Sequence, residues 1–329
     1  MTAAPTRLII DCDPGHDDMA AILLAAHHPA ISVEAITTVC GNASVDNTTN
    51  NALRIVTAFG LDVPVFRGAP QPLLHRYDYP SAFHGPTGLD SAGVDLPPSA
   101  RQEEKKSAVE AIIERVENNP GAISIAVLGP MTNLGLVLAQ RPDLAGAIKQ
   151  IVFMGGSTGE GNVTAVAEFN IWADAEAARI VLRSGVRLAM FGLNVTHQAL
   201  ICPADLDAVR AAVPGENAVA DILDFYCRTF YRFAGADQPG APIHDPCPIA
   251  YLIAPEIFET VACPGKVVVG NESYGQTLID MRRQDPTHDS RTRNVTVATA
   301  IDQKRFTALL IPALCWGAEQ LRNGLSAAT

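Results

Sequence analysis

The sequence predicts an α/β fold in which helices flank an open, mostly parallel β-sheet, within a single domain of residues 1–329. Short β-branched segments alternate with longer helical segments along most of the chain, a pattern typical of parallel strands joined by crossover helices. Hydrophobic residues form 48% of the 329 residues, which is enough for a large core. No internal repeat or linker divides the chain, so one domain is preferred over two.

The first 66 residues show the alternation most clearly. The expected strands are Arg7–Ile10, Ser32–Cys40 and Val63–Phe66, and the expected helices between them are Met19–His28 and Ser44–Phe59. β-Branched residues favour the strands, and Ala and Leu favour the first helix. Residues 70–100 then interrupt the pattern with six prolines, and a loop of that length in a compact domain is usually functional or disordered.

The alternation resumes beyond residue 100 and continues the same sheet. Expected helices are Ser107–Asn118, Pro130–Gln140 and Asp174–Ser184, and expected strands are Ile123–Leu128, Ile148–Met154 and Val186–Phe191. The last third is expected to contain helices Pro203–Ala212 and Glu216–Phe233, β-rich segments at 265–281 and 293–300, and a closing helix Gln303–Gln320. Each helix is assigned from apolar residues that recur with helical period.

Charge and cysteine content exclude several classes of protein. The formal net charge is -11 and no Lys/Arg block is present, so nucleic acid is not expected as a partner and a neutral or cationic small substrate is favoured. The seven cysteines are scattered without a C-x-x-C pair, which favours reduced thiols over a zinc site or disulfides. The N-terminus lacks the build of a signal peptide, and no apolar run approaches the ~20 residues that span a bilayer. We therefore expect a cytoplasmic protein without a membrane segment.

Four aspartates fall within eight residues where the first strand passes into the first helix. The segment I-I-D-C-D-P-G-H-D-D places Asp11, Asp13, Asp17 and Asp18 around a Pro-Gly turn. Helix capping accounts for one or two of them. Four like charges repel one another unless a cation holds them, so the cluster favours a hard divalent metal over a solvated acidic turn. The spacing does not match an EF-hand loop.

Polar groups also follow later predicted strands. L-G-P-M-T-N (128–133) and G-G-S-T-G-E-G-N (155–162) come after two of them, and neither continues into the Gly-Lys-Ser/Thr of a phosphate-binding loop. Glu168 and Asn170 lie two apart, so in extended backbone they would face the same side and bond vicinal hydroxyls. His84, in F-H-G-P-T-G-L-D, and the His244-Asp245 pair, in G-A-P-I-H-D-P-C, are compatible with an ordinary loop or cap when taken alone.

Taken together, these segments resemble one family, the calcium-dependent nucleoside hydrolases, or inosine-uridine nucleoside N-ribohydrolases. The matching motifs are D-C-D-P-G-H-D-D (11–18), A-I-T-T-V-C-G-N (35–42), L-G-P-M-T-N (128–133), M-G-G through A-E-F-N-I (154–171), V-T-H-Q-A (195–199) and G-A-P-I-H-D-P (240–246). They occur in the family's order and spacing over nearly the whole chain. The resemblance implies a Rossmann-like core, a Ca²⁺ cofactor, a ribonucleoside substrate, a role in nucleoside salvage, and a homodimer or homotetramer.

The resemblance also implies roles for individual residues. Asp13, Asp18 and Asp245 would ligate the calcium, with the backbone carbonyl of Leu128 as a further ligand. The residues expected to hold the ribose are Asp17, Asn42, Asn162, Glu168 and Asn170. Asp11 would support the site from behind. His244 would assist departure of the base, and His84 would lie near the base pocket.

Two departures from the family pattern concern the base. H-G-P-T-G (84–88) stands where family members of this type commonly show H-G-E-S-G, so the base preference stays open. Purine-specific relatives are thought to stack the base between tryptophans, yet Trp172 and Trp316 lie outside the loops near 76–90 and 225–243 from which we expect base contacts. Tyr226 and Tyr231 are candidates either for the base pocket or for the core.

The residue types suit cleavage of an N-glycosidic bond. Such cleavage passes through an oxocarbenium-like state, whose positive charge carboxylates stabilise. Calcium would hold the vicinal hydroxyls and a water, and Asp13 would take the proton of that water as general base. His244, with an ordinary pKa of about 6.5, would protonate the base at neutral pH. The matched motifs contain neither Lys nor Arg, which favours a nucleoside over a nucleotide.

Two alternatives belong to other classes. Asp11-Cys-Asp13 could imitate the Asp-x-Asp pair of a Mg²⁺-dependent phosphatase of the haloacid dehalogenase type, but Pro14-Gly15 follows it and the motifs contain no lysine. A nucleoside-binding protein that has lost catalysis is the second alternative. The presence of Asp13 and His244 argues against it, and binding of nucleoside without release of base would support it.

Overall fold

An eight-stranded sheet forms the centre of the protein, in the order β3-β2-β1-β4-β5-β6-β12-β9. The computed structural model describes residues 4–76, 78–282 and 293–327. The strands are β1 (Thr6–Cys12), β2 (Ile31–Thr38), β3 (Val65–Phe66), β4 (Ile123–Val127), β5 (Gln150–Met154), β6 (Leu188–Phe191), β9 (Phe258–Cys263) and β12 (Val295–Ile301). All neighbours are parallel except β9, which is antiparallel to β12. This confirms the predicted open, mostly parallel sheet.

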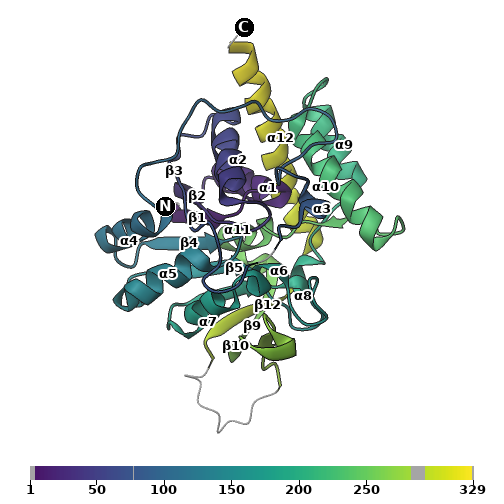
Figure 1. Cartoon of the computed structure of the whole chain (residues 1–329). Helices are drawn as coiled ribbons and strands as arrows, with labels where there is room; N and C mark the ends of the chain where they lie inside the picture. The colour runs from purple at the N-terminus through teal and green to yellow at the C-terminus, as the bar shows by residue number, and fades with distance from the viewer. Residues whose placement is uncertain (1–3, 77, 283–292, 328–329) are drawn as a thin grey trace.

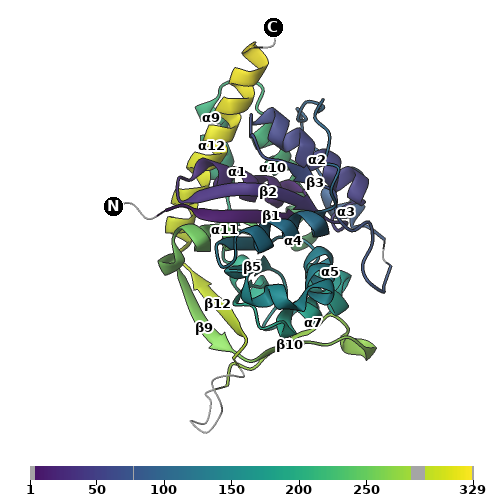
Figure 2. The same cartoon turned by 90° about the vertical axis from the view of Figure 1, so that its left-hand side faces the viewer.

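Helices cover both faces of this sheet, as Figures 1 and 2 show. One face carries α1 (His16–His27), α2 (Val45–Ala58), α11 (Pro246–Ile253) and α12 (Gln303–Ala327), and α9 (Pro203–Ala212) and α10 (Ala218–Ala234) pack against α12. The other face carries α4 (Ala108–Asn118), α5 (Thr132–Gln140) and α7 (Ala175–Arg183). Alternate residues of β1 serve the two cores, because side chains of a strand point to opposite faces: Leu8 and Ile10 enter one, and Ile9 enters the other.

The strand order reverses between β1 and β4. From β1 the chain adds β2 and β3 on one side, and β4, β5 and β6 then follow on the other side. In open α/β sheets, ligands bind beyond the carboxyl ends of the strands at such a switch point. β1 ends at Cys12 and β4 ends at Val127, so the acidic segment 13–18 and the segment 128–133 meet there. The topology alone therefore brings two of the motifs together.

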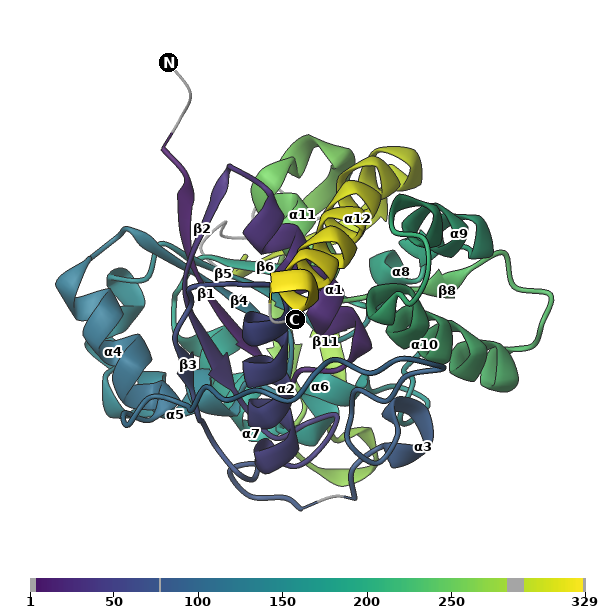
Figure 3. The ribbon, with the colours of Figure 1, turned by 90° about the horizontal axis from the view of Figure 1, so that it is seen from above.

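Short elements complete the fold near this edge. They are the helices α3 (Ser81–His84), α6 (Phe169–Ala173) and α8 (Leu193–Thr196), the pair β7 (Leu200–Ile201) with β8 (Ala241–Pro242), and the pair β10 (Gly265–Val267) with β11 (Thr277–Ile279). Three 3₁₀ turns span Pro142–Gly146, Pro255–Ile257 and Asn271–Ser273. Seen from above, α3 lies beside α10 although the two are far apart in sequence (Figure 3). Among the described residues, no helix is both long and apolar enough to cross a membrane.

Some element boundaries differ from the sequence expectation. α1 begins at His16 rather than Met19, because the carboxylate of Asp18 accepts the backbone N–H of Gly15 at 2.9 Å and starts the helix earlier. α12 continues to Ala327 rather than ending near 320. The edge strand β9 escapes prediction, since its four central residues are exposed and give no apolar run.

Candidate active site

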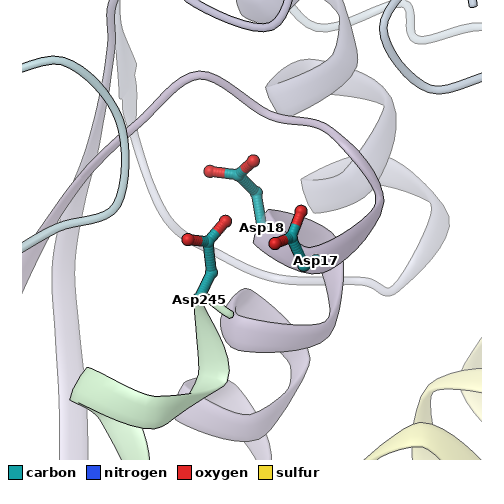
Figure 4. A group of neighbouring side chains, drawn as sticks. All are labelled: Asp17, Asp18 and Asp245. Atoms are coloured by element: carbon teal, nitrogen blue, oxygen red, sulfur yellow. The ribbon is translucent and has the colours of Figure 1, made fainter. Parts of the chain in front are cut away.

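Three carboxyl groups converge at the switch point. Asp17 and Asp18 come from the first turn of α1, and Asp245 is the N-cap residue of α11. One oxygen of each lies within 4.8 Å of the others, and all three residues are buried. Figure 4 shows the carboxyl groups gathered around one spot between the starts of the two helices. The sequence thus folds residues more than two hundred positions apart into one acidic cluster.

The oxygens of this cluster suit a hard divalent cation. Asp18 Oδ2 accepts hydrogen bonds from the Gly15 amide at 2.9 Å and from Asn42 Nδ2 at 3.2 Å. Asp18 Oδ1, in contrast, is buried and accepts no N–H or hydroxyl hydrogen among the described residues, and Asp245 can bond Asp18 only when one of the two carboxyl groups is protonated. A buried, unpartnered carboxylate oxygen is costly unless a cation pairs with it, and carboxylate and carbonyl oxygens are the ligands of hard cations. The residues therefore fit a metal such as calcium or magnesium.

Electrostatics lead to the same conclusion. Burial, reinforced by mutual repulsion, raises the pKa of Asp17 to about 7 and holds the pKa values of Asp13 and Asp245 well above the usual range. Burial also raises the pKa of Asp18 to about 6. The backbone amides of His244 and Asp245, at the start of α11, oppose the rise for Asp17. Two positive charges at this spot would remove the penalty for ionising these groups.

Asp13 sits beside the cluster, held in a cradle of backbone. Its Oδ2 accepts the Asn42 amide at 2.6 Å. A Cβ at Gly41 would lie 1.9 Å from Asp13 Oδ2, and one at Gly129 would lie 2.3 Å from Oδ1, so any side chain at either glycine would displace the carboxylate. The structure groups Asp17, rather than Asp13, with Asp18 and Asp245. Which of the four carboxylates ligate an ion stays a prediction.

Asp11 lies behind these groups and lines no part of the pocket. Its Oδ1 accepts hydrogen bonds from Thr37 Oγ1 at 2.6 Å and Asn133 Nδ2 at 2.8 Å. Asn133 also donates to the Thr38 carbonyl at 2.9 Å, and its own oxygen accepts the Ala69 amide at 2.9 Å. Burial raises the pKa of Asp11 to about 7. This network ties β1 and β2 to α5 beneath the acidic cluster, consistent with the supporting position expected for Asp11.

Glu168 and Asn170 reach the pocket by a different route from the one expected. Glu168 has extended backbone, but Asn170 is already helical: Glu168 caps α6, because its carboxylate accepts the amides of Asn170 at 2.9 Å and Ile171 at 3.2 Å. Burial raises the pKa of Glu168 to about 7. Asn170 Nδ2 donates to the Leu128 carbonyl at 2.7 Å, so it contacts the backbone oxygen expected to ligate the metal. Asn162 turns its oxygen to the Phe169 amide at 2.9 Å.

A cavity of about 410 Å³ opens above the acidic cluster, a volume within the usual range for small-molecule sites. The predicted substrate and catalytic residues that line it are Asp13, Asp17, Asn42, His84, Asn162, Glu168, Asn170 and His244. Asp245 and Leu128 also line it, whereas Asp18 is buried just behind. The structure therefore brings together residues that the sequence placed on six separate segments.

The far end of the cavity is aromatic. Phe83 of α3 and Phe233 of α10 stack with ring centroids 6.0 Å apart, and the Phe233 side chain is 68% exposed at the mouth. Tyr226 lines the cavity beside Phe83 and donates its hydroxyl to the Pro242 carbonyl at 2.6 Å. Tyr231 and the two tryptophans do not line the cavity. The loops from which base contacts were expected thus contribute to this wall.

The histidines of the cavity differ from the expectation in their charge. Burial, with a smaller effect from His197, lowers the pKa of His244 to about 3, and burial holds the pKa of His84 well below its usual range. Burial therefore favours the neutral form of both rings, and His244 does not keep its ordinary pKa as expected. His244 Nδ1 lies 2.8 Å from Thr196 Oγ1, which leaves Nε2 for other partners.

Residues 8–308 match the model of the family described as inosine-uridine preferring nucleoside hydrolase. The chain belongs to this family. This membership confirms the enzyme class predicted from the sequence, a hydrolase that acts on nucleosides, and excludes the phosphatase alternative.

Individual relatives of this nucleoside hydrolase differ in the bases that their names specify. The pyrimidine-specific ribonucleoside hydrolase RihA of Shewanella sp. (strain ANA-3) is 41% identical over 93% of this chain and 95% of its own. RihA of Photobacterium profundum is 40% identical over 93% of this chain and 98% of its own. The structure of a purine-preferring ribonucleoside hydrolase from Gardnerella vaginalis matches with a TM-score of 0.87 and 31% identity. The match covers 95% of this chain and 99% of that one.

Several residues of the hydrolase site escape sequence reasoning. Asn133 and Thr37 lie in quoted motifs, but only the fold shows that both bond Asp11. Phe83 and Phe233 lie within the expected loops, where aromatic residues give no directional signal. His16 stands in the acidic motif, and only its ring contacts reveal that it touches His84.

Proposed function

We propose that this nucleoside hydrolase cleaves pyrimidine ribonucleosides to free base and ribose in a calcium-dependent reaction that serves nucleoside salvage. The observation that carries the proposal is the acidic cluster at the floor of a nucleoside-sized cavity, with Asp18 Oδ1 buried and unpartnered. The preference for pyrimidines is supported by relatives named pyrimidine-specific at about 41% identity, against 31% for the purine-preferring enzyme. The whole chain is proposed to act as one catalytic domain.

The floor of the cavity is proposed to bind the ion and the ribose. Asp13, Asp18, Asp245 and the Leu128 carbonyl would hold the calcium, with Asp17 close enough to join them. When bound, calcium supplies positive charge that holds the vicinal hydroxyls and lowers the pKa of a water. The proposed ribose-binding residues are Asp17, Asn42, Asn162, Glu168 and Asn170.

Asp13 is proposed as the general base. Its backbone cradle fixes the carboxylate, so a proton of the attacking water would pass to an acceptor that needs no reorganisation. Positive charge that develops on the ribose in the oxocarbenium-like state would be stabilised by Asp13, Asp17 and Glu168, which line the cavity. Burial strengthens these interactions because the local dielectric constant is low.

His244 is proposed to stabilise the departing base. When the Thr196 hydroxyl donates to His244 Nδ1, Nε2 carries the hydrogen. A neutral ring can still donate this hydrogen to the base as its negative charge grows, so the lowered pKa is compatible with the role. We further propose a cytoplasmic homodimer or homotetramer, as the family resemblance implies, which size-exclusion chromatography with light scattering would test.

A panel of substrates tests the proposal. Uridine, cytidine, inosine, adenosine and uridine 5′-monophosphate would be incubated with the protein, and both free ribose and free base would be measured, with calcium and with a chelator. We expect ribose and base in equal amounts, most rapidly from uridine or cytidine, and only in the calcium arm. Faster cleavage of inosine would overturn the pyrimidine preference, and release of phosphate without ribose would overturn the activity.

A further inference from the structure

His16 and His84 form a hydrogen-bonded pair that the proposed mechanism does not use. Their Nδ1 atoms lie 3.2 Å apart. His16 opens α1 and is completely buried, with its ring stacked on Phe225 at 5.3 Å between centroids and an interplanar angle of 1°. His84 lies in α3 and lines the cavity. His84, which lines the cavity, is therefore hydrogen-bonded to His16, which is buried and out of reach of a substrate.

The partners of His16 fix the direction of these hydrogen bonds. His16 Nε2 lies 2.8 Å from the Asp90 backbone carbonyl. A carbonyl only accepts, so Nε2 must carry the hydrogen, and the Nδ1 of a neutral His16 then has a lone pair. Two facing Nδ1 atoms cannot both be acceptors. His84 Nδ1 must therefore donate to His16, which leaves Nε2 of a neutral His84 ring without a hydrogen.

The backbone around the pair holds this arrangement in place. Asn51 Nδ2 donates to the Pro14 carbonyl at 3.0 Å and to the Thr87 carbonyl at 2.9 Å, so it links the two segments that carry the histidines. A Cβ at Gly15 would lie 3.1 Å from His84 Nδ1, which is tighter than ordinary contact. Asn51 and Gly15, which do not line the cavity, thus fix the two segments relative to each other.

We propose that His16 is a positioning residue that fixes His84 as a hydrogen-bond acceptor toward the substrate. The inference rests on the proposed function. A ligand must then bring an N–H or O–H donor to this point of the cavity, because a lone pair there would face the lone pair of His84 Nε2. Apart from the vicinal hydroxyls that the calcium would hold, uridine has two groups with this chemistry, the imide N–H of the base and the 5′-hydroxyl of the ribose. In this tautomer His84 cannot protonate the base. His244 is then the histidine that donates a hydrogen to the departing base.

Substrate analogues test whether His84 is an acceptor and show which of the two substrate groups donates to it. 3-Methyluridine lacks the imide N–H, and 5′-deoxyuridine lacks the 5′-hydroxyl. We expect kcat/KM of the wild-type enzyme to fall about 10- to 100-fold for one of the two relative to uridine. The analogue ratio, which is kcat/KM for uridine divided by kcat/KM for the analogue, should return close to one in His84→Ala, because that variant lacks the acceptor. The proposal is overturned if the wild type cleaves both analogues as efficiently as uridine, or if His84→Ala discriminates between uridine and the analogues as strongly as the wild type.

Substitutions at His16 test its positioning role. His16→Leu keeps bulk but has no acceptor, whereas His16→Asn can place an amide oxygen near the position of Nδ1. We expect the analogue ratio to fall at least fivefold in His16→Leu and to stay within about twofold of wild type in His16→Asn. His27→Leu, on the same helix but beside Trp316, is the matched control and should keep the wild-type ratio. Equal ratios in His16→Leu and wild type overturn the role of His16.

Nitrogen NMR of protein labelled with ¹⁵N-histidine reads the tautomer directly. The spectrum should show His84 with its hydrogen on Nδ1, identified by the signal lost in His84→Gln, and this preference should disappear in His16→Leu. A hydrogen on Nε2 of His84 overturns the inference whatever the enzyme cleaves. Absence of ribose release from uridine by the wild type would instead overturn the proposed function, so the two failures are distinguishable.

Discussion

The two ends of the cavity are built in different ways. The floor comes from segments that leave the carboxyl ends of β1, β4 and β5 and from the start of α11, and its acidic residues are almost completely buried. The aromatic end comes from α3, within the long Pro-rich loop, and from α10, and Phe233 there is 68% exposed. We propose that the sheet fixes the chemistry, while the added helices adjust the fit to the base. Relatives named for pyrimidines and for purines within one family are consistent with this division.

The largest expected effect is at the floor. Asp13→Asn keeps the shape of the side chain but removes the proposed general base, and we expect kcat for uridine to fall about 100- to 10,000-fold. Steady-state release of ribose measures it. Asp174→Asn removes a buried carboxylate that caps α7 outside the cavity and should keep activity, with thermal unfolding as the check on folding. A kcat within threefold of wild type for Asp13→Asn would contradict the assignment.

His244 lines the same cavity and directly precedes Asp245 of the floor, so its replacement sharpens the comparison. His244→Ala should slow cleavage of uridine about 10- to 100-fold, because the departing base loses a hydrogen-bond donor. Cleavage of an aryl riboside, whose leaving group needs no hydrogen-bond donor, should slow far less. Parallel assays with uridine and p-nitrophenyl riboside give the two ratios, and equal losses on both substrates would speak against the role.

At the aromatic end we expect changes in binding rather than in chemistry. Phe233→Ala removes an exposed ring that stacks on Phe83, and should raise KM for uridine about 3- to 10-fold with kcat nearly unchanged. Leu74→Ala, at a side chain that is 73% exposed and outside the cavity, is the matched control. A fall in kcat without a change in KM would break the proposed division between the two ends.

The smallest expected effect is on stability. Burial raises the pKa values of Asp11 and Asp17 to about 7 and of Asp18 to about 6 from an ordinary value of 3.8, so the metal-free folded state keeps protons that the unfolded chain releases near pH 4. Stability is therefore lost as pH rises through the folded pKa values. We expect Tm of the chelated protein to be on the order of 5 °C lower at pH 8 than at pH 5.

Calcium provides the control for this pH dependence. On the proposed function it would bind the ionised cluster, and it should therefore raise Tm more at pH 8 than at pH 5. A chelated protein that is more stable at pH 8, or a calcium shift that is equal at both pH values, would be inconsistent with buried carboxylates that repel one another. Thermal unfolding followed by circular dichroism measures both quantities.

The floor was largely predictable from sequence, and the aromatic end was not. Asp13, Asp17 and Asp18 directly follow an apolar strand, and parallel strands place such residues at one edge, so their convergence with Asp245 follows from topology. The helical backbone of Asn170 depends instead on a local hydrogen bond to Glu168, which a two-residue spacing does not encode. Likewise, the lowered pKa of His244 results from burial by distant segments.

At the aromatic end, sequence indicated only which loops would contribute. Phe83 and Phe233 face each other because α3 packs beside α10, a contact between segments about 150 residues apart that no short motif records. The partnership of His16 with His84 is hidden for the same reason. Local patterns specify what each strand end carries, whereas packing of inserted helices depends on the whole chain.

The most direct test of the central claim is a calorimetric titration of calcium into dialysed, metal-free protein, combined with ribose release from uridine. The account predicts a saturable calcium site in the wild type and in Asp174→Asn, activity that returns in proportion to bound calcium, and loss of this site in Asp18→Asn. Full release of ribose by protein that holds no divalent ion would contradict it.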